Sequence, residues 1–282
     1  MKAQLIDGKR ISAEIKAEAA EEAAALKAKG ITPCLAVVLV GDDSASQVYV
    51  NNKKKACEAV GIRSVSHVLS GGTTEETLLE LIAKLNADKD IHGILVQMPV
   101  PKQIDERKVI LAIDPKKDVD CFHPVNVGNL HTGGEGFLPC TPAGIIELIK
   151  RSGHSIEGKQ CVVIGRSNIV GKPVAMLLMQ ENGTVTICHS RTRNLAEICR
   201  GADIIVSAVG KVNTVTADMV KEGAILIDVG MNRNEAGKLC GDVDFENVKE
   251  IAGAITPVPG GVGSVTTSVL IGHVVEAAER TL

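Results

Sequence analysis

Apolar runs alternate with helix-like segments along the first hundred residues of the chain. Three runs have the length and the aliphatic or β-branched content of buried strands: CLAVVLVG (34–41), SVSHVLS (64–70) and GILVQ (93–97). Helices are expected before and between them, over 11–29, 44–60 and 73–86. Gly30 and Gly61 follow the first two as stop signals, and a Thr-Thr-Glu-Glu cap begins the third. This βαβ rhythm predicts a parallel sheet flanked by helices.

The rhythm breaks between Pro99 and Pro142, where few apolar residues recur at regular spacing. An irregular stretch of this length inside a compact domain is uncommon and is often functional. We therefore expect this segment to be largely structureless and to contribute to a site.

The alternation restarts after this segment. Strands are expected at 161–165, at 184–188, within the second half of LAEICRGADIIVSAVG, and at 223–230, with helices at 173–180, at LAEIC and after PGGVG. At 282 residues the chain has the length of about two domains. The predicted fold class is therefore α/β, with two domains that each contain a mainly parallel sheet flanked by helices.

Composition sets the kind of core and excludes some classes of function. Hydrophobic residues make up 45% of the chain but aromatic residues only 1%, so the core has to be aliphatic. A net charge of −3 and a pI near 6.2 give no electrostatic basis for binding nucleic acid or an acidic membrane. No signal-type N-terminus and no run of about 18 apolar residues is present, so we expect a cytoplasmic protein outside the membrane.

The chain contains eight cysteines, at positions 34, 57, 121, 140, 161, 188, 199 and 240. None of them forms a CxxC pair, and no histidine lies at zinc-ligand spacing from a pair. We interpret them as small buried hydrophobic residues and expect no metal site.

A glycine turn between a predicted strand and a helix is the first candidate site. In CVVIGRSNIVGKPVAMLLM, Gly165 ends the strand and Gly171 precedes a helix that has Pro173 in its first turn. Glycines there let the backbone approach a pyrophosphate, and the helix N-terminus offers free N–H groups. The spacing is not GxGxxG, so a simple tight connection remains the alternative.

The end of the next predicted strand indicates which nucleotide such a turn would bind. Enzymes that use NAD place Asp or Glu there for the ribose hydroxyls, but this chain has CHSRTR, with Ser190, Arg191 and Arg193. Arg166 lies in the glycine turn itself. Cationic and hydroxyl side chains can hold a 2′-phosphate that a carboxylate would repel, so the pattern favours NADP.

Tyr49, the only tyrosine of the chain, lies four residues before Lys53 on a predicted helix, which places both side chains on one face. A tyrosine ring can stack on a substrate ring, and a lysine can exchange protons if burial and neighbours favour its neutral form. The next two lysines, Lys54 and Lys55, are expected to be solvated.

Seven separated stretches together resemble the bifunctional methylenetetrahydrofolate dehydrogenase/methenyltetrahydrofolate cyclohydrolase family. In chain order they are YVNNKKKAC, QMPVP, KDVDCFHPVN, PCTPAG, GRSNIVGKP, TICHSRT and PGGVGSVT. The resemblance covers nearly the whole chain and implies oxidation of methylenetetrahydrofolate with NADP followed by hydrolysis of the methenyl product. It also implies a homodimer, a cleft between two domains and a C-terminal helix that returns to the first domain.

The resemblance assigns site residues to both expected domains. The folate-binding catalytic domain would comprise residues 1–140 plus 266–282, and the Rossmann-like NADP-binding domain residues 141–265. The implied catalytic residues are Lys53, Tyr49 and Gln97. The implied folate-binding residues are Tyr49, Asp120, Pro259, Gly260 and Gly261. The implied cofactor-binding residues are Thr141, Gly165, Arg166, Ser167, Ile169, Val170, Gly171, His189, Ser190 and Arg191. Asp118, His123 and Asp228 are interpreted as structural or supporting residues.

Two departures from the family pattern lie next to implied site residues. Cys121 replaces a glycine that many members have after the aspartate, which leads us to expect an altered backbone beside Asp120. Ser264 and Val265 replace Pro-Met. Because proline fixes φ, its loss leaves the backbone of that loop less restricted.

The sequence leaves three alternatives to the bifunctional function. A dehydrogenase without cyclohydrolase activity is the nearest alternative. A different NADP oxidoreductase would leave Tyr49, Lys53, Gln97 and Asp120 unexplained, and a non-catalytic nucleotide sensor would not need Lys53.

Overall fold

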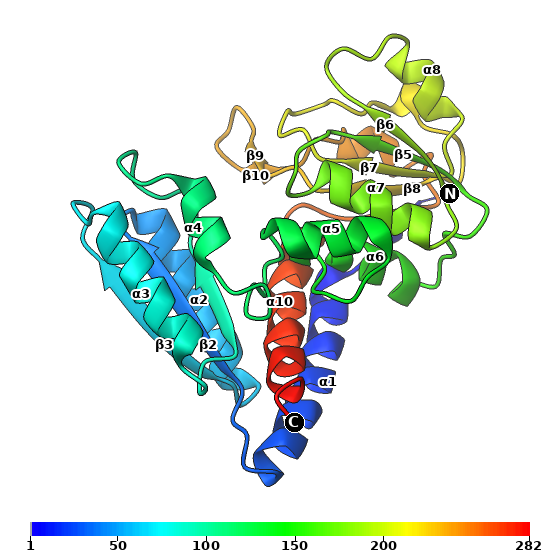
Figure 1. The fold of residues 1–282 in the computed structure, drawn as a ribbon. Helices are drawn as coiled ribbons and strands as arrows, with labels where there is room; N and C mark the ends of the chain where they lie inside the picture. Colours follow the sequence, from blue (N-terminus) through cyan, green and yellow to red (C-terminus); the bar gives the residue numbers. More distant parts are fainter. Residues whose placement is uncertain (1) are drawn as a thin grey trace. The chain divides into compact units, whose positions relative to one another are not determined.

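The computed structural model describes residues 2–282, except the side chains of Ser44, Ala45, Ser46 and Tyr49. The chain divides into two compact units (Figure 1). Unit 1 comprises Met1–Ala13 and Thr141–Thr266, and unit 2 comprises Glu14–Cys140 and Thr267–Leu282. The sequence grouped the N-terminal residues with the first domain, but β1 (Gln4–Leu5) pairs with β11 (Ala254–Ile255) in the sheet of unit 1.

Unit 1 is built on a six-stranded sheet in the order β1-β11-β8-β7-β5-β6, in which all pairs are parallel. The other strands are β5 (Gln160–Ile164), β6 (Thr184–Cys188), β7 (Ile204–Ser207) and β8 (Ile225–Asp228). The helices are α6 (Cys140–Arg151), α7 (Gly171–Gln180), α8 (Leu195–Arg200), the 3-10 turn η1 (Ala217–Met219) and α9 (Phe245–Val248). A short antiparallel hairpin joins β9 (Asn232–Arg233) to β10 (Leu239–Cys240). Aliphatic residues such as Val162, Ile205 and Leu226 form the core.

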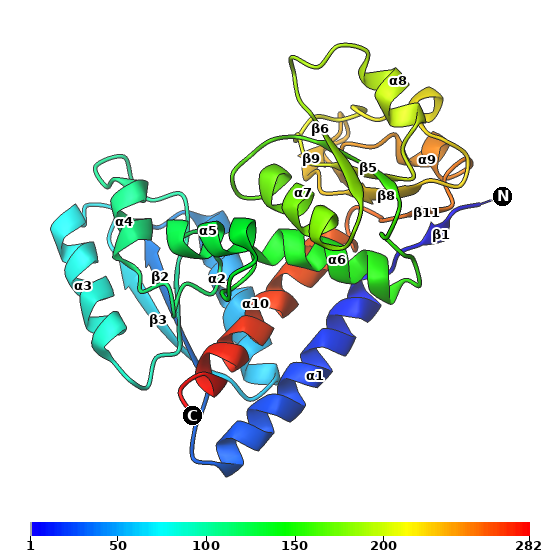
Figure 2. The same ribbon diagram turned by 45° about the vertical axis from the view of Figure 1, so that its right-hand side comes forward.

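Unit 2 contains a three-stranded parallel sheet in the order β3-β2-β4. Its strands are β2 (Cys34–Val40), β3 (Arg63–Leu69) and β4 (Gly93–Val96). Its helices are α2 (Ser44–Ala59), α3 (Glu75–Ala87), α4 (Glu106–Ala112) and α5 (Pro124–Thr132), together with most of α1 (Gly8–Ala28) and of the C-terminal α10 (Val262–Glu279). Figure 2 shows α10 running beside α1 in this unit, as Figure 1 also does.

Local sequence signals account for most of these elements. All seven residues of β2 are buried, which confirms the prediction of a buried strand. Thr74 caps α3 by accepting a hydrogen bond at its hydroxyl from the backbone N–H of Thr77. After α2, Gly61 has φ +78°, a left-handed conformation that suits a glycine at a helix end. The predicted α/β fold class, with a Rossmann-like second half, is confirmed.

The prediction of a largely structureless segment from 99 to 142 is wrong. This segment contains α4, α5 and the first residues of α6. The helices are short, and polar side chains begin them: the Asp105 carboxylate accepts from the N–H of Arg107, and His123 Nδ1 accepts from the N–H of Val125. Such helices give almost no apolar periodicity, which is why the pattern missed them.

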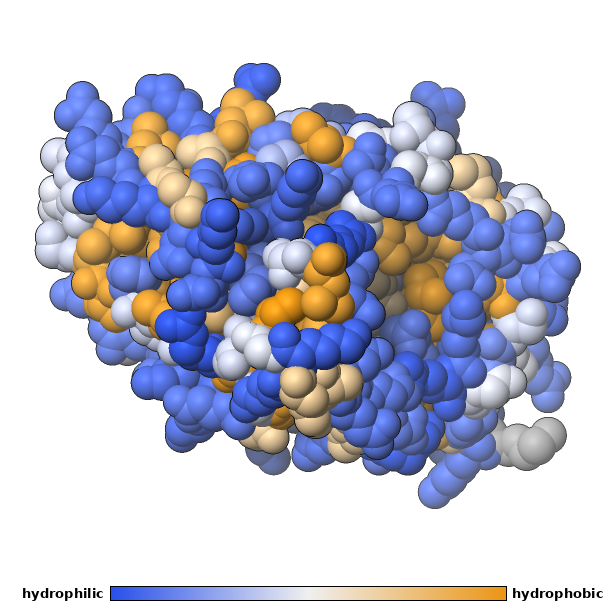
Figure 3. Space-filling model, turned by 60° about the horizontal axis from the view of Figure 1, so that its bottom comes forward, coloured by the Kyte–Doolittle hydropathy of each residue, from blue (hydrophilic) through white to orange (hydrophobic). Residues whose placement is uncertain are grey.

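The surface and the cysteines follow the expectations from composition. Seven of the eight cysteines are buried, and Cys240 is half-buried. Polar residues cover most of the face seen in Figure 3, with apolar residues in smaller groups between them. None of the helices in residues 2–282 combines the length and the apolar character that crossing a bilayer requires.

Candidate active site

Lys53 and Gln97 are in direct contact in unit 2. Lys53 lies on α2, is half-buried, and donates a hydrogen bond from Nζ to Oε1 of Gln97 at 3.1 Å. Gln97 follows β4 directly, and its backbone N–H donates to the carbonyl of Val38. Its Nε2 donates to the carbonyl of Met98 at 2.9 Å, which orients the amide so that Oε1 faces the lysine. Lys53 therefore has a neutral partner that accepts a hydrogen bond without pairing its charge.

Three other residues considered in the sequence, Tyr49, Lys54 and Lys55, also lie on α2. The side chain of Tyr49 lies outside the part that the structure describes, so its predicted stacking role stays a prediction. Lys54 and Lys55 are exposed, and Lys54 approaches Glu58 only to 4.0 Å, which confirms that these two lysines are solvated.

Asp120 lies in a turn that polar contacts hold from several sides. The buried carboxylate of Asp118 accepts from the N–H groups of Phe122 and His123 and from Nδ2 of Asn126, at 2.8–3.2 Å. This confirms the structural role expected of Asp118. The carbonyl of Asp118 accepts from the N–H of Cys121 at 3.0 Å. The turn thus presents the half-buried Asp120 from a fixed backbone.

Cys121 adopts the backbone conformation that a glycine would favour. Its φ is +61°, and its side chain is only 1% exposed. Cys121 therefore adopts the left-handed conformation itself, and the expected change of backbone beside Asp120 stays a prediction.

The pKa of the buried Cys140 thiol responds to both Asp120 and Lys53. Burial and the neighbouring Asp120 carboxylate raise the pKa of Cys140 well above its ordinary value, while the Lys53 ammonium acts in the opposite direction. The charges of Asp120 and Lys53 thus both act on the Cys140 thiol.

In unit 1, the turn after β5 has the shape that a phosphate-binding loop needs. Gly165 has φ +124°, and a Cβ there would lie 2.5 Å from the carbonyl oxygen of Ala208. A Cβ on Gly171 would lie 2.3 Å from the carbonyl oxygen of Gly165. Both positions thus require glycine. The Ser167 hydroxyl accepts from the N–H groups of Val170 and Gly171 at the start of α7.

The end of β6 lies beside this turn. Ile164 of β5 pairs with Cys188 of β6, and the N–H of Gly165 donates to the carbonyl of Cys188 at 2.9 Å. Arg166 and Ser190 come two residues after the paired positions, so both lie at the carboxyl edge of the sheet, and both are exposed. His189 supports this turn, because its Nδ1 accepts from the N–H of Arg191. Ile169 and Arg191 are exposed on the same two loops.

The remaining predicted residues also belong to unit 1. The hydroxyls of Thr141 and Thr266 are 3.1 Å apart. Pro259, Gly260 and Gly261 form a tight turn before α10, in which Gly260 has φ +108°. A Cβ on Gly261 would lie 2.6 Å from the carbonyl oxygen of Pro257.

Two buried carboxylates organise the loops at the carboxyl edge of the unit 1 sheet. Asp228, expected to organise backbone, accepts from the N–H groups of Gly230, Asp242 and Val243 at 2.8–2.9 Å, which confirms this role. Burial raises its pKa to about 6 against these donors. Asp242, which the sequence did not single out, accepts from the N–H groups of residues 209–211. It therefore fixes the loop after β7.

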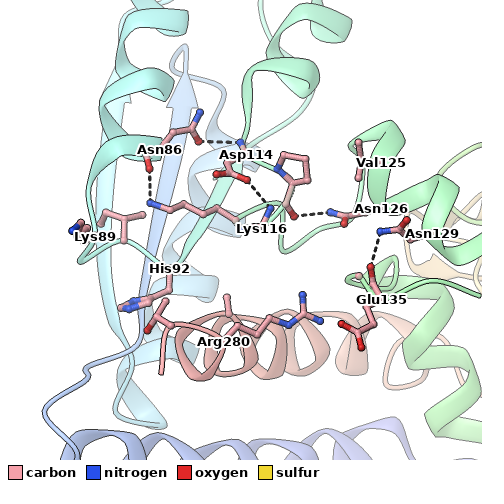
Figure 4. Close-up of a pocket in the computed structure, with 16 residues that line it drawn as sticks. Asn86, Lys89, His92, Asp114, Lys116, Val125, Asn126, Asn129, Glu135 and Arg280 are labelled. Atoms are coloured by element: carbon pink, nitrogen blue, oxygen red, sulfur yellow. Dashed lines mark hydrogen bonds between the residues drawn. The ribbon is translucent and has the colours of Figure 1, made fainter.

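A cavity of about 1040 Å³ in unit 2 is lined by residues other than Lys53, Gln97 and Asp120 (Figure 4). His92, which precedes β4, is one of the residues that line this cavity, whereas Gln97 follows β4. Two of its polar side chains bond backbone groups of other lining residues: Asn86 accepts from the N–H of Asp114, and Asn129 donates to the carbonyl of Glu135. Ligands of parallel sheets bind at the carboxyl ends of strands, and Gln97 lies at that end of β4.

Comparisons with known proteins show the family to which the chain belongs. Residues 6–120 match the model of the tetrahydrofolate dehydrogenase/cyclohydrolase catalytic domain, and residues 139–282 that of the NAD(P)-binding domain of the same family. A bifunctional protein FolD of Agathobacter rectalis is 59% identical over 278 residues, which cover 99% of this chain and all of that protein.

Two solved structures show the same fold over their full length. The bifunctional FolD of Campylobacter jejuni is 50% identical with a TM-score of 0.97, covering 99% of this chain and 100% of the other. The Trypanosoma brucei enzyme, solved with NADP and an inhibitor, is 41% identical with a TM-score of 0.93, covering 100% and 99%. The chain belongs to the tetrahydrofolate dehydrogenase/cyclohydrolase family.

Proposed function

We propose that the chain carries both activities of its family: NADP-dependent oxidation of 5,10-methylenetetrahydrofolate and hydrolysis of the resulting methenyl compound to 10-formyltetrahydrofolate. The observation that carries the proposal is the contact between Lys53 Nζ and Gln97 Oε1. A hydride transfer alone requires no proton carrier, whereas hydrolysis does. A lysine held by a neutral amide is suited to exchange a proton.

The residues of unit 1 fit NADP. A Cβ at Gly165 or Gly171 would clash with the protein's own backbone, so the two glycines permit the tight turn that would bring backbone N–H groups close to a pyrophosphate. Arg166 and Ser190 are exposed at the ends of neighbouring strands, where they would hold a 2′-phosphate. NADP supplies the hydride acceptor, and the protein contributes mainly the positions of the reacting rings.

The residues of unit 2 would perform the hydrolysis. Water adds to the methenyl carbon and loses a proton, which Lys53 accepts. The bond from that carbon to N5 then breaks as the remaining O–H proton is released to solvent and the C=O bond of the formyl group forms, and the proton held by Lys53 passes to N5, so that one proton is released overall. Gln97 keeps Lys53 in place without pairing its charge, and Asp120 would accept hydrogen bonds from the pterin amino group and ring N–H. Tyr49 would provide a stacking surface.

One assay with two readouts tests this function. The purified protein is given methylenetetrahydrofolate and NADP, and both NADPH and the methenyl compound are followed by absorbance. The bifunctional protein should form NADPH with little methenyl accumulation, and should also hydrolyse added methenyltetrahydrofolate faster than buffer does. A monofunctional dehydrogenase would form NADPH and methenyl compound in equal amounts. Absence of NADPH formation would overturn the whole proposal.

We also propose the domain roles and the setting that the resemblance implies. Unit 2 would bind the folate and unit 1 would bind NADP, with Thr141 contributing to the cofactor site. Pro259, Gly260 and Gly261 remain predicted folate-binding residues. The protein would act as a cytoplasmic homodimer. Sedimentation velocity at micromolar concentration should give twice the mass of the 29.6 kDa chain, and a single-chain mass would contradict the dimer.

A further inference from the structure

A buried histidine of the C-terminal helix contacts the backbone that carries Asp120. His273 lies on α10 and is 8% exposed. Its Nδ1 lies 2.8 Å from the carbonyl oxygen of Val119, the residue before Asp120. A carbonyl oxygen can only accept a hydrogen bond, so Nδ1 of this ring carries the proton.

A second side chain donates to the same carbonyl. The thiol of Cys140 lies 3.3 Å from the oxygen of Val119 and 3.6 Å from Nδ1 of His273. The carbonyl of Val119 thus faces two side-chain donors from elements distant in sequence, and Asp120 follows Val119 directly in the chain.

The surroundings keep His273 in one orientation. Its ring lies against Phe137 with centroids 5.4 Å apart, and Phe137 is 1% exposed. The guanidinium of Arg280 covers the ring of Phe137 at 4.6 Å. A ring packed in this way donates its hydrogen bond without first being ordered, which is the property expected of a group that fixes another residue.

We propose that His273 is a positioning residue for the folate site, which holds Asp120 in place through the carbonyl of Val119 with the help of Cys140. Neither side chain reacts with the substrate. This inference rests on the proposed role of Asp120 in binding the pterin. Both reactions use the same ring, so loss of His273 should weaken folate binding in both.

Two substitutions of His273 distinguish the effect of its hydrogen-bond donor from the effect of its side-chain volume. Asn places an amide N–H where Nδ1 lies, whereas Leu has a similar volume without a donor. His273→Leu should raise KM for the folate substrate about 5- to 30-fold in both reactions, because it leaves a buried acceptor with one donor fewer. KM for NADP should stay within about 2-fold, and His273→Asn should restore KM for folate to within about 3-fold.

The alternative is a purely structural histidine. In that case His273→Leu lowers the unfolding midpoint but leaves KM for folate unchanged, or raises KM for folate and NADP alike, and either result overturns the proposal. Failure of His273→Asn to restore folate binding also overturns it. If His273→Leu does not fold, Cys140→Ala compared with Cys140→Ser makes the same comparison at the other donor.

A double-mutant cycle distinguishes this proposal from the role of Asp120 itself. If Asp120→Asn leaves KM for folate unchanged, the proposed function of Asp120 fails. If Asp120→Asn raises KM and His273→Leu does not, only the positioning role fails. If His273 acts through Asp120, the double variant should bind folate about as weakly as Asp120→Asn alone, and multiplicative effects would overturn the proposal.

Discussion

Gln97 offers Lys53 an uncharged acceptor at 3.1 Å, although the two residues are 44 positions apart in the chain. A carboxylate at position 97 would bind the ammonium more strongly and would hold it in the charged form. The amide holds the position of Nζ through a hydrogen bond without pairing its charge. This relationship leads to the first prediction.

Lys53→Met should separate the two activities. Methionine keeps the aliphatic length and the helix propensity but cannot exchange a proton. Cyclohydrolase activity should fall ~10²–10⁴-fold, while hydride transfer loses only what positioning and local charge supplied. The methenyl compound should then accumulate in the two-readout assay. Lys54→Met, on the same helix but exposed, is the control and should leave both rates unchanged. Proportional loss of both activities would make Lys53 a binding residue instead.

Arg166→Ala should reduce the use of NADP far more than the use of NAD. One charge-assisted contact to a phosphate contributes about 1.5–3 kcal/mol, so kcat/KM for NADP should fall roughly 10- to 150-fold. Arg200→Ala removes a guanidinium of the same unit that pairs with Asp218, and should change neither cofactor constant. Equal losses with NADP and NAD would show that another group holds the 2′-phosphate.

Cys121 can be replaced by glycine at little cost, but not by valine. Glycine adopts the left-handed conformation at φ +61° without strain, which stabilises the folded state. The loss of the buried side chain and the greater freedom of the unfolded chain act in the opposite direction. The free energy of unfolding should therefore change by less than ~1 kcal/mol. KM for folate should stay within about 3-fold. Cys121→Val, β-branched at the same φ, should cost ~2 kcal/mol or more in chemical denaturation. Equal stability of both variants would contradict a strained backbone.

Asp228→Asn should destabilise the protein in a pH-dependent way. The amide NH₂ would face a backbone N–H donor, at a cost of ~1–3 kcal/mol at pH 7. The pKa of Asp228 is raised from 3.8 to about 6, so the folded state binds more protons than the unfolded state between these values. Wild-type stability from this group therefore increases as the pH falls from 6 to 4, and that of the variant does not.

The penalty of Asp228→Asn should consequently grow by up to ~3 kcal/mol between pH 7 and pH 4. Chemical denaturation followed by circular dichroism at pH 4, 5, 6 and 7 measures it, with the exposed Asp218→Asn as a control. A penalty that shrinks at low pH would mean that the three N–H donors outweigh burial.

The sequence predicted the elements whose apolar residues recur at strand or helix spacing. β2, β5 and β6 lie within a residue of their expected bounds, because buried parallel strands are continuous aliphatic runs. α4 and α5 were missed, because hydrogen bonds of Asp105, His123 and Asn126 determine them more than burial does. β1 was missed because a strand of two residues is too short to show an alternating hydrophobic pattern.

The candidate site also contains residues that the sequence pattern indicated and residues that it did not. The glycine turn after β5 was visible locally, because strand, glycine and helix follow one another. Lys53, Gln97 and Asp120 come from separate elements, so only the resemblance linked them. His273 was missed altogether. A histidine within the apolar run VLIGHVVEAA is the available signal, and nothing in the run indicates that the carbonyl of Val119 is its partner.

The order in which the chain passes between its units has a consequence for biosynthesis. It leaves unit 1 after Ala13, returns at Thr141 and leaves again after Thr266, so each unit is made of two separated segments. A nascent chain on the ribosome cannot complete the six-stranded sheet until β11 has emerged, nor provide His273 to the turn of Asp120 until almost the last residue is joined. Neither half should therefore mature first during translation, and a message that ends early should yield two incomplete units instead of one working domain.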